Sequence, residues 1–232
     1  MMQGLILAGG RGSRLAADGV ETPKALVEVA GRPQLIHLIQ TFEALGCESV
    51  TCMVRDGVTA EVPPPAVVHT CHTPSSLHTL VAGLAVAPPG PVFCAMVDTV
   101  MPAADWSRVY RAVTDCLATG SLAVLAITPF VDDELPLYVT NNSAGVATGI
   151  FDAPPGDGSR PLVTGGVYGL SPVARRLAGV AVSSLHRMRA FLKLLVDLRA
   201  PVATVEIPRI IDLDHKRDLD AAESWLGARI DR

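Results

Sequence analysis

The sequence predicts a single α/β domain in which a mixed, mainly parallel sheet is flanked by helices. Over the first 130 of its 232 residues, short apolar runs alternate with segments of helical apolar spacing. This order is typical of a parallel sheet covered by helices. From residue 137 to residue 170 the pattern is less regular and rich in Gly, Pro and Thr, which indicates that an antiparallel part joins the sheet there.

Each expected strand is a short apolar run that ends at turn residues. By this criterion strands cover residues 4–8, 49–54, 67–69, 92–97, 122–127, 146–151, 162–170 and 202–207, with a further extended piece at 25–29. Helices are expected at residues 33–45, 75–86, 105–117, 183–198 and 215–226. Pro33 suits a first helical turn, Gly46 suits the residue after a helix end, and Ser75 and Asp105 suit N-caps.

The composition excludes several functional classes. The net charge of -4 argues against a nucleic-acid binder that works by bulk charge. No apolar run is long enough to span a bilayer and no basic leader precedes the first apolar run, so we expect a cytoplasmic protein without a membrane partner. The odd number of cysteines favours free thiols in a reducing compartment: Cys47, Cys52, Cys71, Cys94 and Cys116. The apolar content of 49% would also suit a homo-oligomer.

A glycine-rich loop follows the first expected strand, in the stretch "LILAGGRGSRL". Glycines let backbone N–H groups approach phosphate oxygens, and Arg11 and Arg14 add donors that suit phosphate. The stretch is not a Walker A loop, which needs G-x-x-x-x-G-K-[ST]. It also lacks the third glycine of the dinucleotide fingerprint, where Leu15 stands, and we expect no helix there because Gly19 and Pro23 follow soon after.

A longer pattern resembles a known family. "LILAGGRGSRL", six further residues and "TPKALVEVAGRP" resemble the N-terminal signature of sugar-phosphate nucleotidyltransferases, the NDP-sugar pyrophosphorylases. The matching positions are Gly9, Gly10, Gly12, Arg14, Leu15, Pro23, Lys24, Leu26, Gly31 and Pro33. The resemblance implies a Rossmann-like fold of the GT-A type, with residues 1–130 binding the nucleotide and residues 131–232 binding the acceptor.

The resemblance also implies roles for particular residues on the nucleotide side. Arg14 and Lys24 would be catalytic, Arg14 by neutralising the departing pyrophosphate and Lys24 by bridging the α-phosphate and the incoming acceptor phosphate. Ser76, in "TPSSLHTLVAGL", stands where the family usually has a glycine near the base, although an ordinary capped helix explains this segment equally well. The full nucleotide-binding set would be Leu7, Ala8, Gly9, Gly10, Gly12 and Ser76.

Two distant aspartates are candidate ligands for Mg²⁺. Asp98 ends an apolar strand, where an unpaired carboxylate is unfavourable and where Mg²⁺ finds the oxygen ligands it prefers. The closing stretch "IIDLDHKRDLDAAESWL" resembles the family's D-V-D-T-P-E-D-L segment, so Asp212 lines up best with the second metal-binding aspartate. Asp214 is the alternative ligand or an N-cap of the last helix, and Asp218 and Asp220 resemble a solvated helix face.

The acceptor side departs from the family pattern. "GGVYGLSP" resembles the strand under the acceptor, which points to Gly166, but the family's asparagine and its E-K-P segment are absent. The missing lysine of E-K-P normally holds the acceptor phosphate. Arg160 or Lys193 could replace it, although solvent exposure is the commoner role for each.

The resemblance therefore predicts transfer of a nucleoside monophosphate from a nucleoside triphosphate to a sugar 1-phosphate, with release of pyrophosphate. Two alternatives remain: a cytidylyltransferase acting on a non-sugar phosphate such as phosphocholine, and a non-catalytic ligand-sensing homologue. Retention of Arg14, Lys24, Asp98 and Asp212 counts against the last. Molybdopterin nucleotidyltransferases, which lack a proline before the lysine, match less well because Pro23 precedes Lys24.

Overall fold

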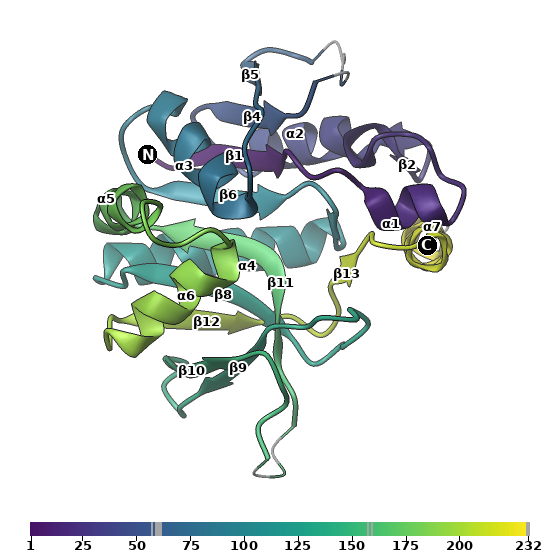
Figure 1. Ribbon diagram of the computed structural model, residues 1–232. Helices are drawn as coiled ribbons and strands as arrows, with labels where there is room; N and C mark the ends of the chain where they lie inside the picture. Colours follow the sequence, from purple (N-terminus) through teal and green to yellow (C-terminus); the bar gives the residue numbers. More distant parts are fainter. Residues whose placement is uncertain (57, 59–61, 157, 159, 231–232) are drawn as a thin grey trace.

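The computed structural model describes residues 1–232 except 57, 59–61, 157, 159 and 231–232. Among these residues nine strands form one mixed sheet (Figure 1). They are β1 Gln3–Ala8, β4 Val50–Val54, β5 Ala66–Thr70, β6 Val92–Met96, β8 Ala123–Thr128, β9 Tyr138–Asn141, β10 Ala147–Phe151, β11 Val163–Leu170 and β12 Val202–Glu206. Strands from both halves of the chain share this sheet, which confirms the predicted architecture.

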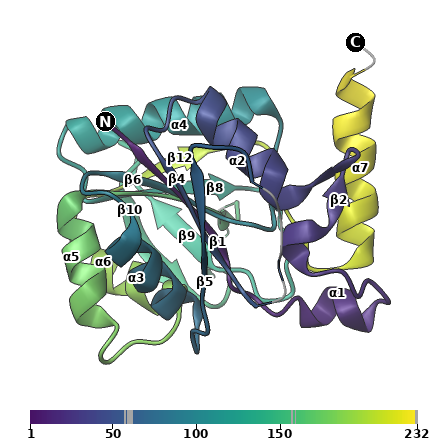
Figure 2. The same cartoon turned by 90° about the horizontal axis from the view of Figure 1, so that it is seen from above.

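Helices cover both faces of the sheet (Figure 2). One face packs against α2 (Gln34–Ala44) and α4 (Ala103–Ala118), and the other against α3 (Ser76–Val86), α5 (Pro172–Ala181) and α6 (Met188–Asp197). Within β1, Leu5 and Leu7 enter the core under α3, whereas Ile6 and Ala8 enter the core under α2. All six residues of β1 are buried, because a strand inside a parallel sheet has no solvent face.

The antiparallel element expected in the middle of the chain is β11. It lies between β6 and β8 and runs antiparallel to both, while β1 pairs in parallel with β4 and β6, and β8 pairs in parallel with β12. The β9–β10 hairpin joins the end of β11 at Val163. The strand β9 was absent from the sequence prediction.

The strand order places a binding crevice beside β1. After β1 the chain continues outward through β4 and β5, and then returns to add β6 on the other side of β1. In open α/β sheets, ligands bind at the carboxyl ends of the strands where the order reverses in this way. The glycine loop follows β1 and Asp98 follows β6, so both lie at this point.

Several short elements were missed or misplaced by the sequence prediction. A short helix, α1, begins at Ser13 and runs to Ala17, although none was expected there, and the extended piece 25–29 is a 3-10 turn, η1 (Lys24–Leu26), followed by β2 (Glu28–Val29), which pairs with β3 (Arg32–Pro33). Two two-residue strands, β7 (Thr99–Val100) and β13 (Ile211–Asp212), pair with each other. The helix expected from residue 105 already begins at Ala103, with Asp105 in its first turn.

The helix α5 was missed because its buried stripe consists only of Ala174, Ala178 and Ala181, which gives little hydrophobic periodicity. Its start nevertheless has a sequence signal, since Ser171 caps the helix by accepting a hydrogen bond from the backbone N–H of Ala174 at 3.2 Å. The helix expected at 183–198 begins only at Met188, because the preceding residues contact the start of α3 instead.

The last helix, α7 (Lys216–Ile230), is attached to the edge of the sheet by a small separate core. This core contains Val29, Val100, Ile211, Leu213 and Ala222. Arg209 adds to the attachment, since its guanidinium lies 4.5 Å from the ring centre of Phe130 and 5.0 Å from that of Trp225. No helix among the described residues combines the length and the apolar character that crossing a bilayer requires.

Arg175 of α5 donates hydrogen bonds to backbone carbonyls at the carboxyl end of α3 and in the turn that follows. Its guanidinium donates hydrogen bonds of 2.7–3.1 Å to the backbone carbonyls of Leu84, Ala87, Pro88 and Gly90. Carbonyls at a helix end and in the following turn lack helical partners. One side chain therefore satisfies four acceptors and holds two helices together.

We expect Arg175→Met to lower the free energy of unfolding by about 1–2 kcal/mol, because hydrogen bonds to a charged donor are lost at partly buried carbonyls. Urea denaturation measures this difference. Arg176→Met is the matched control, since the neighbouring Arg176 is exposed. Equal stability of the two variants would contradict the assigned role.

Candidate active site

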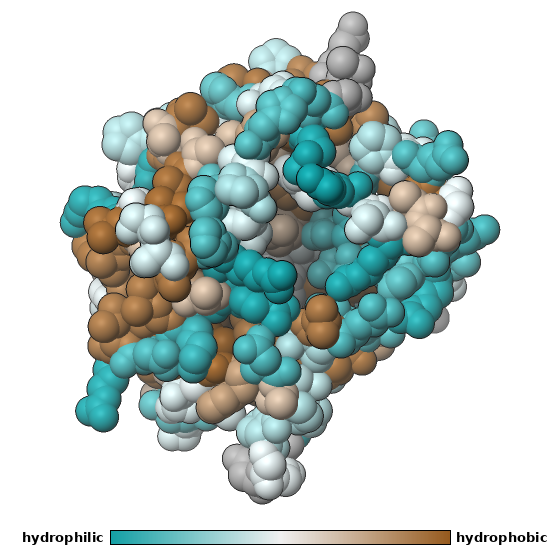
Figure 3. Space-filling view, viewed as in Figure 1, coloured by the Kyte–Doolittle hydropathy of each residue, from teal (hydrophilic) through white to brown (hydrophobic). Residues whose placement is uncertain are grey.

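The candidate site lies at the carboxyl ends of β1 and β6, on the face that Figure 3 shows hollowed near its centre and surrounded by hydrophilic residues. The glycine loop forms one wall. Gly10 has open space where a side chain would project, and Gly12 adopts a left-handed backbone with φ 62°. A Cβ at Gly9 would lie 3.1 Å from the Thr79 side chain, so this glycine permits close packing of the loop on α3.

Arg55 holds the glycine loop from the side. Its Nε donates a hydrogen bond of 3.1 Å to the carbonyl of Gly9. Arg55 was not among the candidates predicted from the sequence. A signal was present nevertheless, because Arg55 directly follows an expected strand and therefore lies at the same edge of the sheet as the loop.

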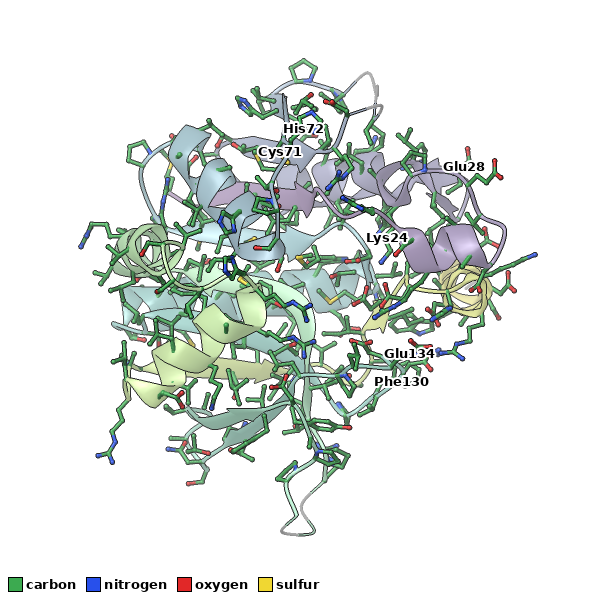
Figure 4. All side chains as sticks on the ribbon, viewed as in Figure 1. Lys24, Glu28, Cys71, His72, Phe130 and Glu134 are labelled. Carbon is green, nitrogen blue, oxygen red and sulfur yellow. The ribbon has the colours of Figure 1, made fainter. Side chains whose placement is uncertain are left out.

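The centre of the site is the ammonium group of Lys24. Its Nζ lies 2.7 Å from Oδ2 of Asp98 and 2.6 Å from Oδ1 of Asp214. Arg14, from α1, forms an ion pair with the other oxygen of Asp214. In Figure 4 Lys24 lies near the middle of this face, between the strands and the loop that carries Phe130 and Glu134. The predicted convergence of Arg14, Lys24 and the acidic residues is therefore observed.

The β7–β13 pair brings the distant acidic residues together. Asp212 is paired with Thr99 in this ladder, and the backbone N–H of Leu213 donates to the carbonyl of Asp98 at 3.0 Å. Residues more than one hundred positions apart in the sequence thereby become neighbours. These two strands are too short to leave a periodic signal in the sequence.

The charges of the cluster shift the pKa values of its members. Burial acts to lower the pKa of Lys24, but the carboxylates of Asp98, Asp212 and Asp214 outweigh it and raise that pKa above its usual value. The Asp212 side chain is exposed to solvent where it lines a cavity, but protein atoms lie around its carboxyl group on the other sides. Burial and the carboxylates of Asp98 and Asp214 raise the pKa of Asp212 well above its usual range, with Lys24 opposing them.

The cluster has the donor set of a divalent-cation site. One carboxylate oxygen from each of Asp98, Asp212 and Asp214 lies within 4.8 Å of the others. Among the described residues, Oδ1 of Asp98 is buried and has no hydrogen-bond partner. A buried oxygen without a partner is unfavourable, and a hard cation such as Mg²⁺ would satisfy it. The residues present therefore fit such an ion.

The structure corrects the reading of the closing segment. Asp214 does not cap α7, because its carboxylate faces Lys24 and Arg14. Asp218, in the first turn of α7, is 3% exposed and accepts the backbone N–H groups of Asp214 and His215, which precede the helix, at 3.0 and 2.6 Å. The N–H of Lys216, the first helical residue, donates to Oδ2 of Asp18 at 3.1 Å. The expectation that Asp218 belongs to a solvated face was wrong.

The nucleotide-side candidates line two adjoining cavities. A cavity of about 260 Å³ is lined by Leu7, Gly9, Gly10 and Ser76, and a neighbouring one of about 130 Å³ by Ala8, Gly12 and Lys24. Ser76 does more than line a wall, because its Oγ accepts the backbone N–H of Met188 at 3.0 Å. The Ser75 side chain bonds to His186 rather than capping α3.

A larger cavity of about 460 Å³ adjoins the nucleotide side and shares Ser76 and Met96 with it. Gly166 lines this cavity with a φ of 73°, and a side chain there would collide with the hydroxyl of Thr99. Arg14, Asp98 and Asp212 line it as well.

The two basic candidates for the acceptor side lie elsewhere. Arg160 is 2.6 Å from Glu206, and Lys193 forms an exposed pair with Asp197 within α6. Instead, Arg187 and Arg189 line the larger cavity. Neither was among the candidates predicted from the sequence, because both fall within the helix expected at 183–198, which begins only at Met188.

The chain is similar to known proteins in sequence and in fold. The family model of the MobA-like NTP transferase domain matches residues 4–198.

Curated relatives are similar over a shorter stretch. Mannose-1-phosphate guanyltransferase of Pichia angusta is 42% identical over 54 residues, and a probable mannose-1-phosphate guanylyltransferase of Arabidopsis thaliana is 38% identical over 54 residues. These matches cover 23% of this chain and 15% of the length of each relative.

Solved structures share the fold over nearly the whole chain. The inositol-1-phosphate CTP transferase of T. maritima has a TM-score of 0.74 at 14% identity, covering 96% of this chain and 94% of that one. A putative glucose-1-phosphate thymidylyltransferase from Bacillus anthracis has a TM-score of 0.76 at 16% identity, covering 97% and 95%. At these identities the likeness concerns the fold.

We expect Asp212→Asn to increase the free energy of unfolding at pH 8 in buffer that contains a metal chelator. The folded-state pKa of Asp212 is raised above its unfolded value, so the ionised carboxylate disfavours the fold above that pKa. This penalty disappears as the pH falls through the raised pKa toward the unfolded one. The advantage of the variant should therefore shrink on acidification.

Urea denaturation between pH 8 and pH 4 measures this trend. Asp220→Asn is the matched control, because it removes the same charge from an exposed position on α7. A variant less stable than the wild type at pH 8 would contradict the charge balance described for the cluster.

Proposed function

This chain belongs to the MobA-like NTP transferase domain family, and from that premise we propose that it transfers a nucleoside monophosphate from a nucleoside triphosphate to a sugar 1-phosphate. The observation that carries the proposal is the Lys24 cluster, with Asp98 and Asp214 within 2.7 Å of its ammonium group, between a nucleotide-side cavity and a larger second cavity. Both cavities open onto the same charged centre, as two phosphorylated substrates require.

In the proposed reaction an oxygen of the acceptor phosphate attacks the α-phosphorus of the triphosphate. A new P–O bond forms, the bond to the β-phosphate oxygen breaks, and pyrophosphate leaves with that electron pair. The attacking oxygen is already ionised, so no strong general base is needed. The tasks left to the protein are alignment of the two phosphates and stabilisation of the charge that develops between them.

Lys24 is placed for the central electrostatic task. Its side chain is 10% exposed, and the surrounding carboxylates raise its pKa, so it stays protonated throughout the physiological range. A protonated ammonium group can donate to the α-phosphate and to the incoming phosphate at once. Arg14 would neutralise the departing pyrophosphate, and the open backbone at Gly10 would receive the nucleotide phosphates.

Asp98 and Asp212 would hold Mg²⁺, with Asp214 beside them. When bound, the ion supplies positive charge at the transferring phosphate and orients the phosphate oxygens. Asp214 also holds both Lys24 and Arg14, so it links the two basic groups in the absence of substrate.

A second candidate acceptor is a non-sugar phosphate such as phosphocholine. Two observations favour it. The E-K-P segment is absent, and the two residues that could replace its lysine, Arg160 and Lys193, pair with acidic residues outside the larger cavity. The acceptor in this case would still be a phosphomonoester, and the chemistry at Lys24 would be the same.

We expect pyrophosphate release from the wild-type protein with a nucleoside triphosphate and a sugar 1-phosphate in the presence of Mg²⁺. The informative pairs are GTP with mannose 1-phosphate, CTP with inositol 1-phosphate, dTTP with glucose 1-phosphate, and CTP with phosphocholine. The fastest release from phosphocholine would establish the second candidate. Absence of release from every pair would favour a non-catalytic homologue.

We expect Lys24→Ala to lower the turnover rate by about two to three powers of ten, by analogy with the loss of one donor that stabilises a developing charge. The fold should remain intact in circular dichroism. Lys216→Ala is the matched control, because its side chain is exposed at the start of α7. Turnover near the wild-type rate in Lys24→Ala would overturn the assignment.

A further inference from the structure

We propose that Arg187 binds the phosphate group of the acceptor and takes the place of the missing E-K-P lysine, and that Ser76 holds Arg187 in position. This inference rests on the proposed function and names the residue that recognises the second substrate. The ligand it implies is a phosphomonoester dianion whose remainder occupies the cavity of about 460 Å³.

Of the three arginines that line the larger cavity, two have partners and one, Arg187, has none among the described residues. The three are Arg14, Arg187 and Arg189. Arg14 is paired with Asp214. Arg189 is 2.7 Å from Asp152 and donates to the carbonyl of Leu135 at 2.9 Å.

Within the described part of the chain, the guanidinium of Arg187 has neither an ion-pair nor a hydrogen-bond partner. An arginine in a cavity wall with all its donors free is suited to a phosphate, which it can bind through two parallel hydrogen bonds. Asp98 and Asp212 line the same cavity, and they repel an anion unless a cation lies between them. Arg187 therefore marks the part of the cavity that attracts a phosphate directly.

The backbone on both sides of Arg187 is fixed to the start of α3. The carbonyl of His186 accepts hydrogen bonds from the N–H of Leu77, at 3.3 Å, and from the hydroxyl of Ser75. On the other side, the N–H of Met188 donates to Oγ of Ser76 at 3.0 Å. The rings of His78 and His186 also stack, with centres 5.7 Å apart.

These contacts hold residues 186 and 188 while the side chain between them stays free. They also explain why a serine is useful at position 76, where a glycine could not accept the Met188 N–H. Ser76 lines both the nucleotide-side cavity and the larger one, so a nucleotide against this wall would also steady the segment that carries Arg187. Ser76 thus acts as a positioning residue, and Arg187 makes the contact.

The kinetic test uses the most active substrate pair of the wild-type protein. With the triphosphate saturating, we expect Arg187→Ala to raise the KM for the acceptor by about tenfold to a hundredfold, the range for one charge-assisted contact. The KM for the triphosphate should change less than twofold, and Arg187→Lys should restore part of the loss. Arg176→Ala, which removes the same charge from an exposed site on α5, should leave both constants unchanged.

The role of Ser76 predicts a different pattern. Ser76→Gly should raise the KM for the acceptor with little change in kcat, and Ser76→Thr, which keeps the hydroxyl, should restore it. An equal fall in kcat for both variants with an unchanged acceptor KM would show a merely structural role and would overturn the positioning claim.

A binding measurement separates this inference from the proposed function. Calorimetry with mannose 1-phosphate should show binding to the wild type that is lost in Arg187→Ala, and neutral mannose should bind neither protein. This result together with no pyrophosphate release would overturn the transfer reaction and retain the phosphate site. Turnover in the wild type with an unchanged acceptor KM in Arg187→Ala would retain the reaction and overturn the role of Arg187.

Discussion

The arrangement of the site depends on one interaction, the contact of the Lys24 ammonium with the carboxylates of Asp98 and Asp214. Three carboxyl groups within 4.8 Å of one another repel when ionised, and the buried cation offsets part of that repulsion. The same contact joins η1 to the turn after β6 and to the segment before α7. Three distant parts of the chain therefore meet at one charge.

The strand order of the sheet positions the Lys24 cluster. Because β6 returns beside β1 after the chain has built β4 and β5, the carboxyl ends of β1 and β6 face an open crevice rather than a covered edge. The small β7–β13 ladder then extends the crevice with Asp212. The antiparallel strand β11 adds Gly166 opposite Thr99, where only a glycine leaves the cavity open.

The nucleotide-side cavity of about 260 Å³ and the larger cavity of about 460 Å³ also have walls that contact each other. The start of α3 contacts the nucleotide side, and the segment before α6 contacts the larger cavity. They are joined because the hydroxyl of Ser75 and the N–H of Leu77 donate to the carbonyl of His186, and the N–H of Met188 donates to the hydroxyl of Ser76. These hydrogen bonds fix the start of α3 to the segment before α6 and so hold the two walls against each other.

The sequence by itself determined the buried strands and the glycine loop, because apolar runs and glycine spacing are local properties. The family resemblance selected Lys24, Asp98 and Asp212 as candidate site residues. Only the tertiary structure decided which acidic residue near the end of the chain faces Lys24 and which accepts the backbone N–H groups before α7, since Asp214 and Asp218 differ in their contacts rather than in their chemistry. It also placed Arg187 in the cavity wall. That position depends on hydrogen bonds between α3 and a segment more than one hundred residues later, which no local pattern encodes.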